Sequence, residues 1–389
     1  MTAMTAVNGL TLTPSMLEFR ELNRALAIDL RREALAVDAD PFDYDRLRKC
    51  GALELLREMS MPAAYRTREV PACADEFTGS ALGRVVANIE LASAGDVSVL
   101  NASATPSLAG LAIDALADDK QKDRFYRDMA EQRAWTFFGM TEPDHGSDAT
   151  AMETRLDPDP NTDGFLLNGT KRYVANAERG ALGVVFARTG RTPLSIRAAI
   201  LRRPSLGFTG TPLQMTGLRG ACIGHMEFDN TPIELEQLLG QHLPASRRGL
   251  WGAMRAFNVI RLQIAAQALG ASFAIRDYVR EQRGPAWSGH ELMSARLEAA
   301  RTLLHRTAAH VDQSPDDRLA PSIAKLHTTE LAQEATRWAE AALGPASLLE
   351  HPLLEKWCRD VSAFEFMDGT SNILRLTIAS DAEPAQARS

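Results

Sequence analysis

Residues 137–148 read Phe137-Phe-Gly-Met-Thr-Glu-Pro-Asp-His-Gly-Ser-Asp148, and this segment is the most informative part of the sequence about the fold. Thr141 and Ser147 supply hydroxyl groups, and Gly146 lets a ligand approach the backbone closely. Successive backbone amides around Gly146 and Ser147 predict a small anion-binding site that suits a pyrophosphate. Taken alone, such a turn is more often an ordinary loop, so the flanking sequence has to decide.

The pattern of the surrounding sequence, from about Ala134 to Glu236, is typical of β-strands. Short apolar runs such as Gly164-Phe-Leu-Leu-Asn168, Gly183-Val-Val-Phe-Ala-Arg188 and His225-Met-Glu-Phe-Asp229 are separated by Gly, Pro, Asn and Asp. Asn168-Gly169 lies between two such runs and predicts a hairpin turn.

Both flanks of this region are predicted to be helical. From about Ser15 to Gln132, Ala-, Leu-, Arg- and Glu-rich segments recur, as in Met16–Val37 and Asp43–Met59. From Arg247 onward the helical pattern returns in Pro321–Leu343 and Arg359–Ile378, and Leu262, Ala266, Leu269 and Phe273 form one apolar stripe. The sequence therefore predicts an α+β protein with three domains, residues 1–132, 133–238 and 239–389.

The composition argues against several classes of protein. A chain of 389 residues with 45% hydrophobic and 24% charged residues is typical of a soluble globular protein of two or three subdomains. A net charge of −7 argues against general nucleic-acid binding, because such surfaces must neutralise phosphates. The sequence contains no run of about 18 apolar residues, so it predicts no membrane-spanning helix. Met1–Pro14 lacks the pattern of a signal peptide.

The cysteines and histidines predict neither a disulfide framework nor a metal site. Cys50, Cys73, Cys222 and Cys358 lie far apart and form no C-x-x-C pair, which favours a reducing cytoplasm. His305 and His310 are not spaced to share a helix face. His145 lies in the 137–148 segment, where it either lines a ligand bound there or its entrance, or is a solvated loop residue.

At this point the sequence resembles the acyl-CoA dehydrogenase family, whose signature is T-E-P-x-x-G-S-D. The matching pieces occur in the family's order: Thr141-Glu-Pro with Gly146-Ser-Asp148, Leu167-Asn-Gly-Thr-Lys171 with Asn176, Gly217-Leu-Arg-Gly220 with Phe228-Asp-Asn230, Arg261-Leu-Gln-Ile-Ala-Ala-Gln-Ala-Leu-Gly270, and Arg359-Asp360 with Asp368-Gly-Thr-Ser-Asn-Ile-Leu-Arg375. They span roughly Ala130 to Ile378, whereas the N-terminal helical part fits less distinctly.

The resemblance implies a helical N-terminal domain, a β-barrel-like middle domain and a C-terminal four-helix bundle, with FAD held between the last two. It also implies a homodimer or homotetramer, because a neighbouring subunit contacts the adenine half of FAD in this family. Carried over residue by residue, the cofactor-binding residues are Phe138, Met140, Thr141, Gly146, Ser147, Tyr173, Ala175, Arg283, Gly344, Thr370 and Asn372. No metal is implied.

The chain departs from the family at several of these positions. Tyr173 stands where the family has a flavin-stacking Trp, which keeps an aromatic face, and Ala175 stands where it has a flavin-contacting Thr, which removes a hydroxyl. Arg283 and Gly344 lie in two segments that match the family pattern only weakly. They are the candidate contacts for the FAD of the partner subunit. Trp287 either replaces a missing Phe or belongs to the core.

The family's catalytic glutamate maps to Asp368. Some relatives carry the base beside the arginine of the R-x-x-x-A-A helix, where this chain has Ile260, so Asp368 is the remaining candidate. A carboxylate beside an apolar acyl chain suits proton removal because burial raises its pKa. Aspartate is one methylene shorter, by about 1.5 Å, and a misplacement of about 1 Å can lower a rate on the order of 10²-fold.

The function that the resemblance implies is FAD-dependent oxidation of an acyl thioester, with Asp368 removing a proton and flavin N5 accepting a hydride. The short base leaves open an unusual substrate, including γ,δ-dehydrogenation in secondary metabolism. A nitroalkane-oxidase-like enzyme, an acyl-CoA oxidase and a non-catalytic FAD-binding scaffold are the alternatives. The acyl carrier is CoA or a carrier protein, and Arg202-Arg203 and Arg247-Arg248 are candidate basic residues for binding an acidic carrier protein. The electron acceptor is electron-transfer flavoprotein or oxygen.

Overall fold

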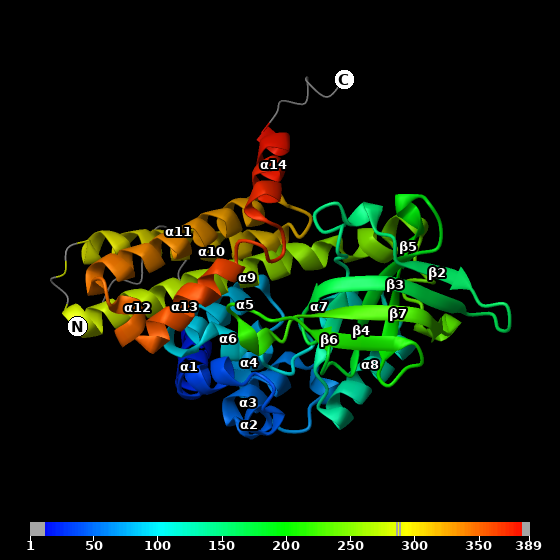
Figure 1. The fold of residues 1–389 in the computed structure, drawn as a ribbon, viewed down its shortest axis with the longest axis horizontal. Coiled ribbons are helices and arrows are strands. Elements are labelled where there is room, and N and C mark those ends of the chain that lie inside the picture. The colour runs from blue at the N-terminus through cyan, green and yellow to red at the C-terminus, as the bar shows by residue number, and fades with distance from the viewer. Residues whose placement is uncertain (1–11, 285–286, 288, 383–389) are drawn as a thin grey trace.

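The computed structural model describes residues 12–284, 287 and 289–382, and most helices from the two ends of the chain pack together beside one sheet, which lies at the right of the view (Figure 1). The N-terminal helices are α1 (Pro14–Ala39), α2 (Tyr44–Lys49), α3 (Gly51–Ser60), α4 (Ala72–Phe77), α5 (Ala81–Glu90), α6 (Val97–Asn101), α7 (Ser107–Leu116) and α8 (Asp119–Gln132). A π-helical turn, Leu91–Gly95, joins α5 to α6. Local chemistry sets α8: Asp118 and Gln121 form a capping box at its start, and Arg133 ends it in a left-handed conformation.

The middle of the chain forms a seven-stranded mixed sheet. Its strands are β1 (Thr136–Gly139), β2 (Arg155–Pro158), β3 (Phe165–Val174), β4 (Leu182–Arg188), β5 (Ile196–Arg202), β6 (Phe208–Pro212) and β7 (Gly224–Ile233). They lie in the order β1-β4-β2-β3-β7-β6, and β5 pairs with β4. β1 and β4 run parallel, whereas β3 pairs antiparallel with β7.

The C-terminal part contains three long helices, α9 (Gly249–Arg283), α10 (His290–Gln313) and α11 (Leu319–Leu343). Two shorter helices, α12 (Ser347–Glu350) and α13 (Pro352–Ala363), precede the final α14 (Ser371–Ala382), which projects from the body (Figure 1). This order confirms the predicted α+β class. The division into domains at 132/133 and 238/239 stays a prediction. No helix in the described part of the chain is both long and apolar enough to cross a membrane.

The hairpin turn predicted at Asn168-Gly169 is wrong. Both residues lie inside β3, where the pairing with β7 shifts register between Leu167 and Gly169. Gly169 has φ +133°, and a Cβ added there would lie 2.8 Å from the Cα of Thr154. The glycine therefore permits a bulge and a close backbone approach in place of a turn.

Two helices predicted as continuous are interrupted. Asp43–Met59 divides at Cys50 into α2 and α3. Arg359–Ile378 divides into α13 and α14, and residues 364–370 between them form the loop that carries Asp368. Asp368 and Gly369 both have positive φ, 50° and 107°, which a helix interior does not accommodate.

The helix α9 is the central support of the molecule. The predicted stripe of Leu262, Ala266, Leu269 and Phe273 is buried and packs against α5, α10 and α11. Gly270 lies on α9 where it crosses the π-helical turn, and a Cβ there would lie 2.6 Å from the Cβ of Ala92.

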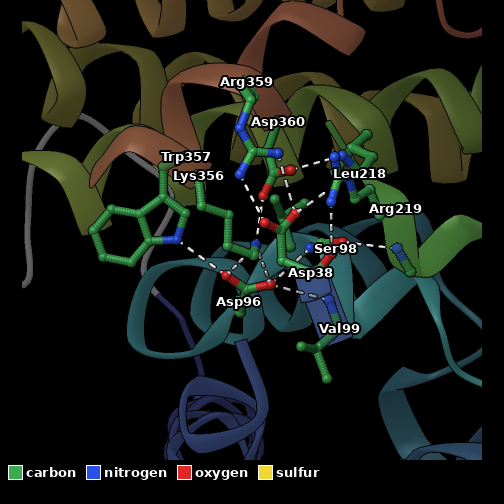
Figure 2. Close-up of polar contacts among 12 residues, drawn as sticks. Asp38, Asp96, Ser98, Val99, Leu218, Arg219, Lys356, Trp357, Arg359 and Asp360 are labelled. Carbon is green, nitrogen blue, oxygen red and sulfur yellow. Dashed lines mark hydrogen bonds and ion pairs between the residues drawn. The ribbon is translucent and has the colours of Figure 1, made fainter. Parts of the chain in front are cut away.

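A buried polar cluster joins all three parts of the chain (Figure 2). Lys356 of α13 is fully buried and donates to Asp96 at 2.7 Å and to Asp360 at 2.6 Å. Asp96 also caps α6 by accepting the amides of Ser98 and Val99. Asp360 accepts the amide of Leu218, in the loop before β7, at 2.6 Å. The cluster therefore fixes this loop relative to the helices on either side.

Candidate active site

The loop that contains Thr141 and Ser147 is held from beneath by a buried ion pair. Lys171 of β3 is fully buried, and its ammonium donates to Glu142 Oε1 at 2.8 Å and to the carbonyl of Met140 at 3.0 Å. Glu142 also accepts the amides of Glu153 at 2.6 Å and Thr154 at 2.9 Å. The carboxylate therefore fixes the loop and leaves Gly146 and Ser147 exposed to meet a ligand.

The end of β3 presents an aromatic ring to solvent in a strained conformation. Tyr173 has φ +60° and is 60% exposed, and Arg172 lies 5.4 Å from its ring centroid. A left-handed conformation at a bulky residue is uncommon and persists where the surroundings impose it, as they do at functional sites. Asn176, also at positive φ, fixes the segment by donating to Thr136 O at 2.8 Å. Ala175 is exposed beside them.

An apolar surface adjoins this loop. Phe138 and Met140 are half-buried, and the ring of Phe138 lies 6.0 Å from that of Phe257 on α9. Phe257 and Arg261 are four residues apart on α9 and so share one face of that helix. Arg261 Nε in turn donates to the backbone carbonyl of Asp368 at 3.1 Å. One face of α9 therefore bridges the predicted cofactor loop and the predicted base.

Asp368 lies in the α13–α14 loop among cationic groups. Burial raises the pKa of its carboxyl above the ordinary value, against the opposing influence of Arg261 and Lys325. A raised pKa increases the proton affinity of the carboxylate, which suits a general base. Ile260, at the alternative base position, is buried.

Two further predicted residues follow the predicted base. Thr370 Oγ1 accepts the amide of Ile373 at 3.3 Å and so caps the start of α14. Asn372 is exposed on the first turn of that helix, and its Oδ1 accepts from Arg375 at 3.2 Å.

Arg283 and Gly344 come together at the other end of the helical bundle. Arg283 Nε donates to Ala342 O at 3.0 Å, and its Nη2 donates to Leu343 O at 3.2 Å, next to Gly344. Twenty-two residues of α9 separate Arg261 from Arg283, about 33 Å at 1.5 Å per residue. This pair therefore does not join the group around Asp368 within one chain. Trp287 is 36% exposed beneath the Arg283 guanidinium, so it is not a core residue.

The residues present fit an FAD. The exposed ring of Tyr173 offers a stacking face, half-buried Phe138 and Met140 offer apolar contacts, and the exposed Gly146-Ser147 segment offers amides and a hydroxyl. A Cβ at Gly146 would meet only the side chain of Thr141, at 3.6 Å, so the backbone there is open to a ligand. This combination suits a flavin ring joined to a pyrophosphate.

Three of the four arginines proposed to bind a carrier protein form hydrogen bonds or ion pairs within the chain. Arg202 pairs with Asp128 at 2.5 Å, Arg203 donates to Ala177 O at 2.7 Å, and Arg248 donates to Gln241 O at 3.3 Å. Arg247 is exposed. In the described ranges, no group of three or more His, Cys, Asp or Glu side chains is arranged to hold a metal ion.

The sequence interpretation missed two buried lysines. Lys171 enters the sequence interpretation only as part of the Leu167–Lys171 motif, and no sequence pattern points to Lys325. Both side chains are fully buried, and each donates to a backbone carbonyl of a predicted site segment, at Met140 and at Gly369. The sequence offered no clear signal for Lys171, which Thr170 and Arg172 flank, whereas Lys325 lies between Ala324 and Leu326. Lysine is almost never fully buried unless it is paired, so composition alone places both at the surface.

Comparison with known proteins identifies the family. Residues 137–231 match the family model for the acyl-CoA dehydrogenase middle domain, and residues 247–382 match that for the C-terminal domain. A short-chain-specific acyl-CoA dehydrogenase of Clostridium acetobutylicum is 27% identical over 318 residues, which cover 77% of this chain and 82% of that protein.

Solved structures show the same fold. The structure of butyryl-CoA dehydrogenase from Megasphaera elsdenii superposes with a TM-score of 0.82 at 23% identity, covering 96% of this chain and 99% of the other. A structure of PigA with FAD and proline gives a TM-score of 0.82 at 18% identity, covering 96% and 98%. Two matched domain models in the right order, together with these relatives, show that the chain belongs to the acyl-CoA dehydrogenase family.

Proposed function

We propose that the protein oxidises an acyl-CoA thioester with Asp368 as the catalytic base. The observation that supports this proposal is the position of Asp368. Burial raises the pKa of its carboxyl, and its loop is hydrogen-bonded to Arg261, on the same face of α9 as Phe257. FAD, when bound, accepts the hydride equivalent that the substrate loses. Asp368 accepts the proton from the carbon α to the thioester carbonyl, and the product is the α,β-unsaturated thioester.

Other residues of the chain hold and enclose the reactants in this proposal. Phe138, Met140, Thr141 and Tyr173 face the flavin, Gly146 and Ser147 bind the pyrophosphate, and Thr370 and Asn372 complete the pocket beside the base. Ala175 supplies no hydroxyl to the flavin. The half-buried apolar surface of Phe138, Met140, Met254 and Phe257 suits an acyl chain and excludes water.

CoA is favoured over a carrier protein as the acyl carrier. Asp128 already neutralises Arg202, and Arg203 and Arg248 donate to backbone carbonyls of their own chain, which leaves fewer free donors for an acidic partner protein. The family models also describe acyl-CoA dehydrogenases. Equal turnover of one acyl group as its CoA and carrier-protein thioesters would remove this preference.

The test is anaerobic flavin bleaching in a stopped-flow spectrometer. Butyryl-CoA is expected to bleach the flavin of the wild type, whereas nitroethane is not, and Asp368→Asn is expected to lose bleaching while it retains bound FAD. A wild-type rate in Asp368→Asn would sink the base assignment. Bleaching by 2-enoyl thioesters alone would redirect the reaction to the γ carbon. Re-oxidation rates in air and with electron-transfer flavoprotein then separate an oxidase from a dehydrogenase.

We further propose that the protein is a homo-oligomer in which Arg283 and Gly344 reach the FAD of a partner subunit. The supporting observation is their separation from Arg261 along α9, about 33 Å. Leu376 on α14, Phe366 on the loop before it and Ile323 on α11, which contacts α14, expose 65%, 73% and 40% of their surface, as an unpaired interface would.

Light scattering after size exclusion tests the oligomer. Leu376→Glu is expected to shift the wild-type oligomer toward a monomer and to weaken FAD retention. Leu206→Glu, a substitution at an 80% exposed residue in the sheet region, is the matched control and is expected to change neither. A monomeric wild type with full FAD occupancy would exclude the shared site.

A further inference from the structure

Lys325 is a fully buried cation directly behind the base-bearing loop. It lies on α11, and its ammonium donates to the backbone carbonyl of Gly369 at 2.8 Å. In the described part of the chain no carboxylate forms an ion pair with it, although burying an ammonium is costly without a partner. A packing role alone would be filled at lower cost by an apolar side chain of the same length. The charge therefore needs a reason.

The reason lies in the conformation of the loop. Asp368 has φ +50°, a left-handed conformation that is unfavourable for a residue other than glycine unless the surroundings impose it, and Gly369 follows at φ +107° without steric cost. Arg261 donates to the carbonyl of Asp368 at 3.1 Å, and Lys325 donates to the next carbonyl, that of Gly369. Two cations from two different helices thus hold consecutive peptide groups, and this fixes the direction of the Asp368 side chain.

The charges around Lys325 are few. The carboxylates of Asp368 and Glu365 and the guanidinium of Arg261 face it. Glu365 is already bonded to Ser371 Oγ at 2.7 Å. Burial lowers the pKa of Lys325 to about 8, although both carboxylates oppose this. A cation beside Asp368 favours the ionised form that accepts a proton.

We propose that Lys325 is a positioning residue for the proposed base: its ammonium holds the Asp368-Gly369 turn in place and favours the ionised form of the Asp368 carboxyl. This inference rests on the proposed function for its consequence in catalysis. Its structural part, the pinned turn, stands independently of that function.

Two variants separate the two effects. Lys325→Met removes both the donor and the charge, and Lys325→Gln keeps a donor without the charge. Thr328→Val, a buried position on the same helix whose hydroxyl bonds only within α11, is the matched control. Each FAD-loaded variant is compared with the wild type by amide hydrogen exchange of the 365–371 segment and by the pH profile of flavin reduction with butyryl-CoA.

In Lys325→Met, exchange of residues 365–371 is expected to rise at least tenfold, and flavin reduction to slow on the order of 10²-fold because the base is misplaced. The acidic limb of its rate profile moves to higher pH, since loss of a cation raises the pKa of Asp368. Lys325→Gln is expected to move the limb with less change in exchange, and Thr328→Val to change neither.

Unchanged exchange in Lys325→Met overturns the proposal whatever the substrate proves to be. Increased exchange with an unmoved acidic limb overturns the charge role and retains the pinned turn. A wild-type rate in Asp368→Asn, by contrast, removes the base role of Asp368 and leaves the exchange result to decide on Lys325.

Discussion

At the scale of single residues, the aspartate at the proposed base position has a conformational explanation. Asp368 adopts φ +50°, and Asp tolerates the left-handed region better than Glu does. Gly369, at φ +107°, continues the turn at no steric cost. An Asp-Gly pair therefore suits this loop. Whether the shorter side chain still reaches the substrate α carbon depends on how close to the loop the substrate lies.

Asp368→Glu tests which of these holds. The longer side chain reaches about 1.5 Å further, so flavin reduction by butyryl-CoA is expected to rise on the order of 10–10²-fold if the native base is set back from the α carbon. The strained backbone is expected to cost about 1 kcal/mol of unfolding free energy. Stopped-flow bleaching and urea denaturation measure the two effects. A slower variant would instead show that the native substrate lies closer to the loop.

Glu142 illustrates a signature residue whose role is structural. Glu142→Gln leaves the Lys171 ammonium buried without a counter-charge, and it is expected to lower the free energy of unfolding by about 3–5 kcal/mol. Urea denaturation at pH 7 measures this loss. Glu153→Gln, at a side chain that is 82% exposed, is the control and should change stability by less than about 0.5 kcal/mol.

The same carboxylate predicts a pH dependence of stability. Burial raises the pKa of Glu142, but Lys171 and the contacts to Glu153 and Thr154 lower it more, so the folded pKa lies below the unfolded value. Its contribution is therefore fully present above about pH 4.5 and is lost as the pH falls through the folded pKa. Unfolding curves in acid are expected to show this loss in the wild type and a smaller one in Glu142→Gln. Parallel acid curves would contradict it.

At the scale of elements, the glycine that ends the Arg261–Gly270 motif is explained by helix packing. A Cβ at Gly270 would lie 2.6 Å from Ala92 Cβ and 2.7 Å from the carbonyl of Ile89, both on the α5 side of the contact. The α9 backbone therefore approaches the π-helical turn more closely than any side chain permits.

Gly270→Ala is expected to lower stability by about 1–3 kcal/mol, since α9 and α5 must separate to accept the methyl group. Gly51→Ala, at the start of α3 with nothing within 4 Å of the added Cβ, is expected to be neutral or slightly stabilising. Chemical denaturation of the two variants decides. Equal stability of both would show that α9 yields easily at this contact.

At the scale of the whole molecule, the Asp96–Lys356–Asp360 cluster connects segments more than 250 positions apart in the chain. Lys356→Met would leave two carboxylates facing each other in a buried site. We expect a loss of about 3–5 kcal/mol and increased hydrogen exchange in both α6 and the loop at Leu218, which the cluster fixes together (Figure 2).

Lys120→Met provides the comparison, because Lys120 is 81% exposed and its pair with Glu236 is at the surface. That change is expected to stay within about 0.5 kcal/mol. If Lys356→Met disturbed α13 alone, the cluster would be a local feature of that helix and would not connect the three parts of the chain.

The sequence predicts the secondary-structure elements of this protein better than the contacts between them. Apolar periodicity correctly predicted the helices at both ends, the strands between them and the buried α9 stripe, because burial of one face is written along the chain. Motif resemblance correctly identified the family and FAD as its cofactor. Asp368, Tyr173 and the other site residues remain predictions.

Tertiary structure alone decided the rest. Asn168-Gly169 became a bulge because Thr154 lies against it, and the predicted helix through Asp368 was broken by a turn that Arg261 and Lys325 hold from other helices. Lys171, Lys325 and Lys356 look like surface residues in the sequence, and all three are buried. Local propensity and periodicity report which face a residue prefers. Which distant group satisfies a buried charge or a strained turn depends on contacts that form only when the chain has folded.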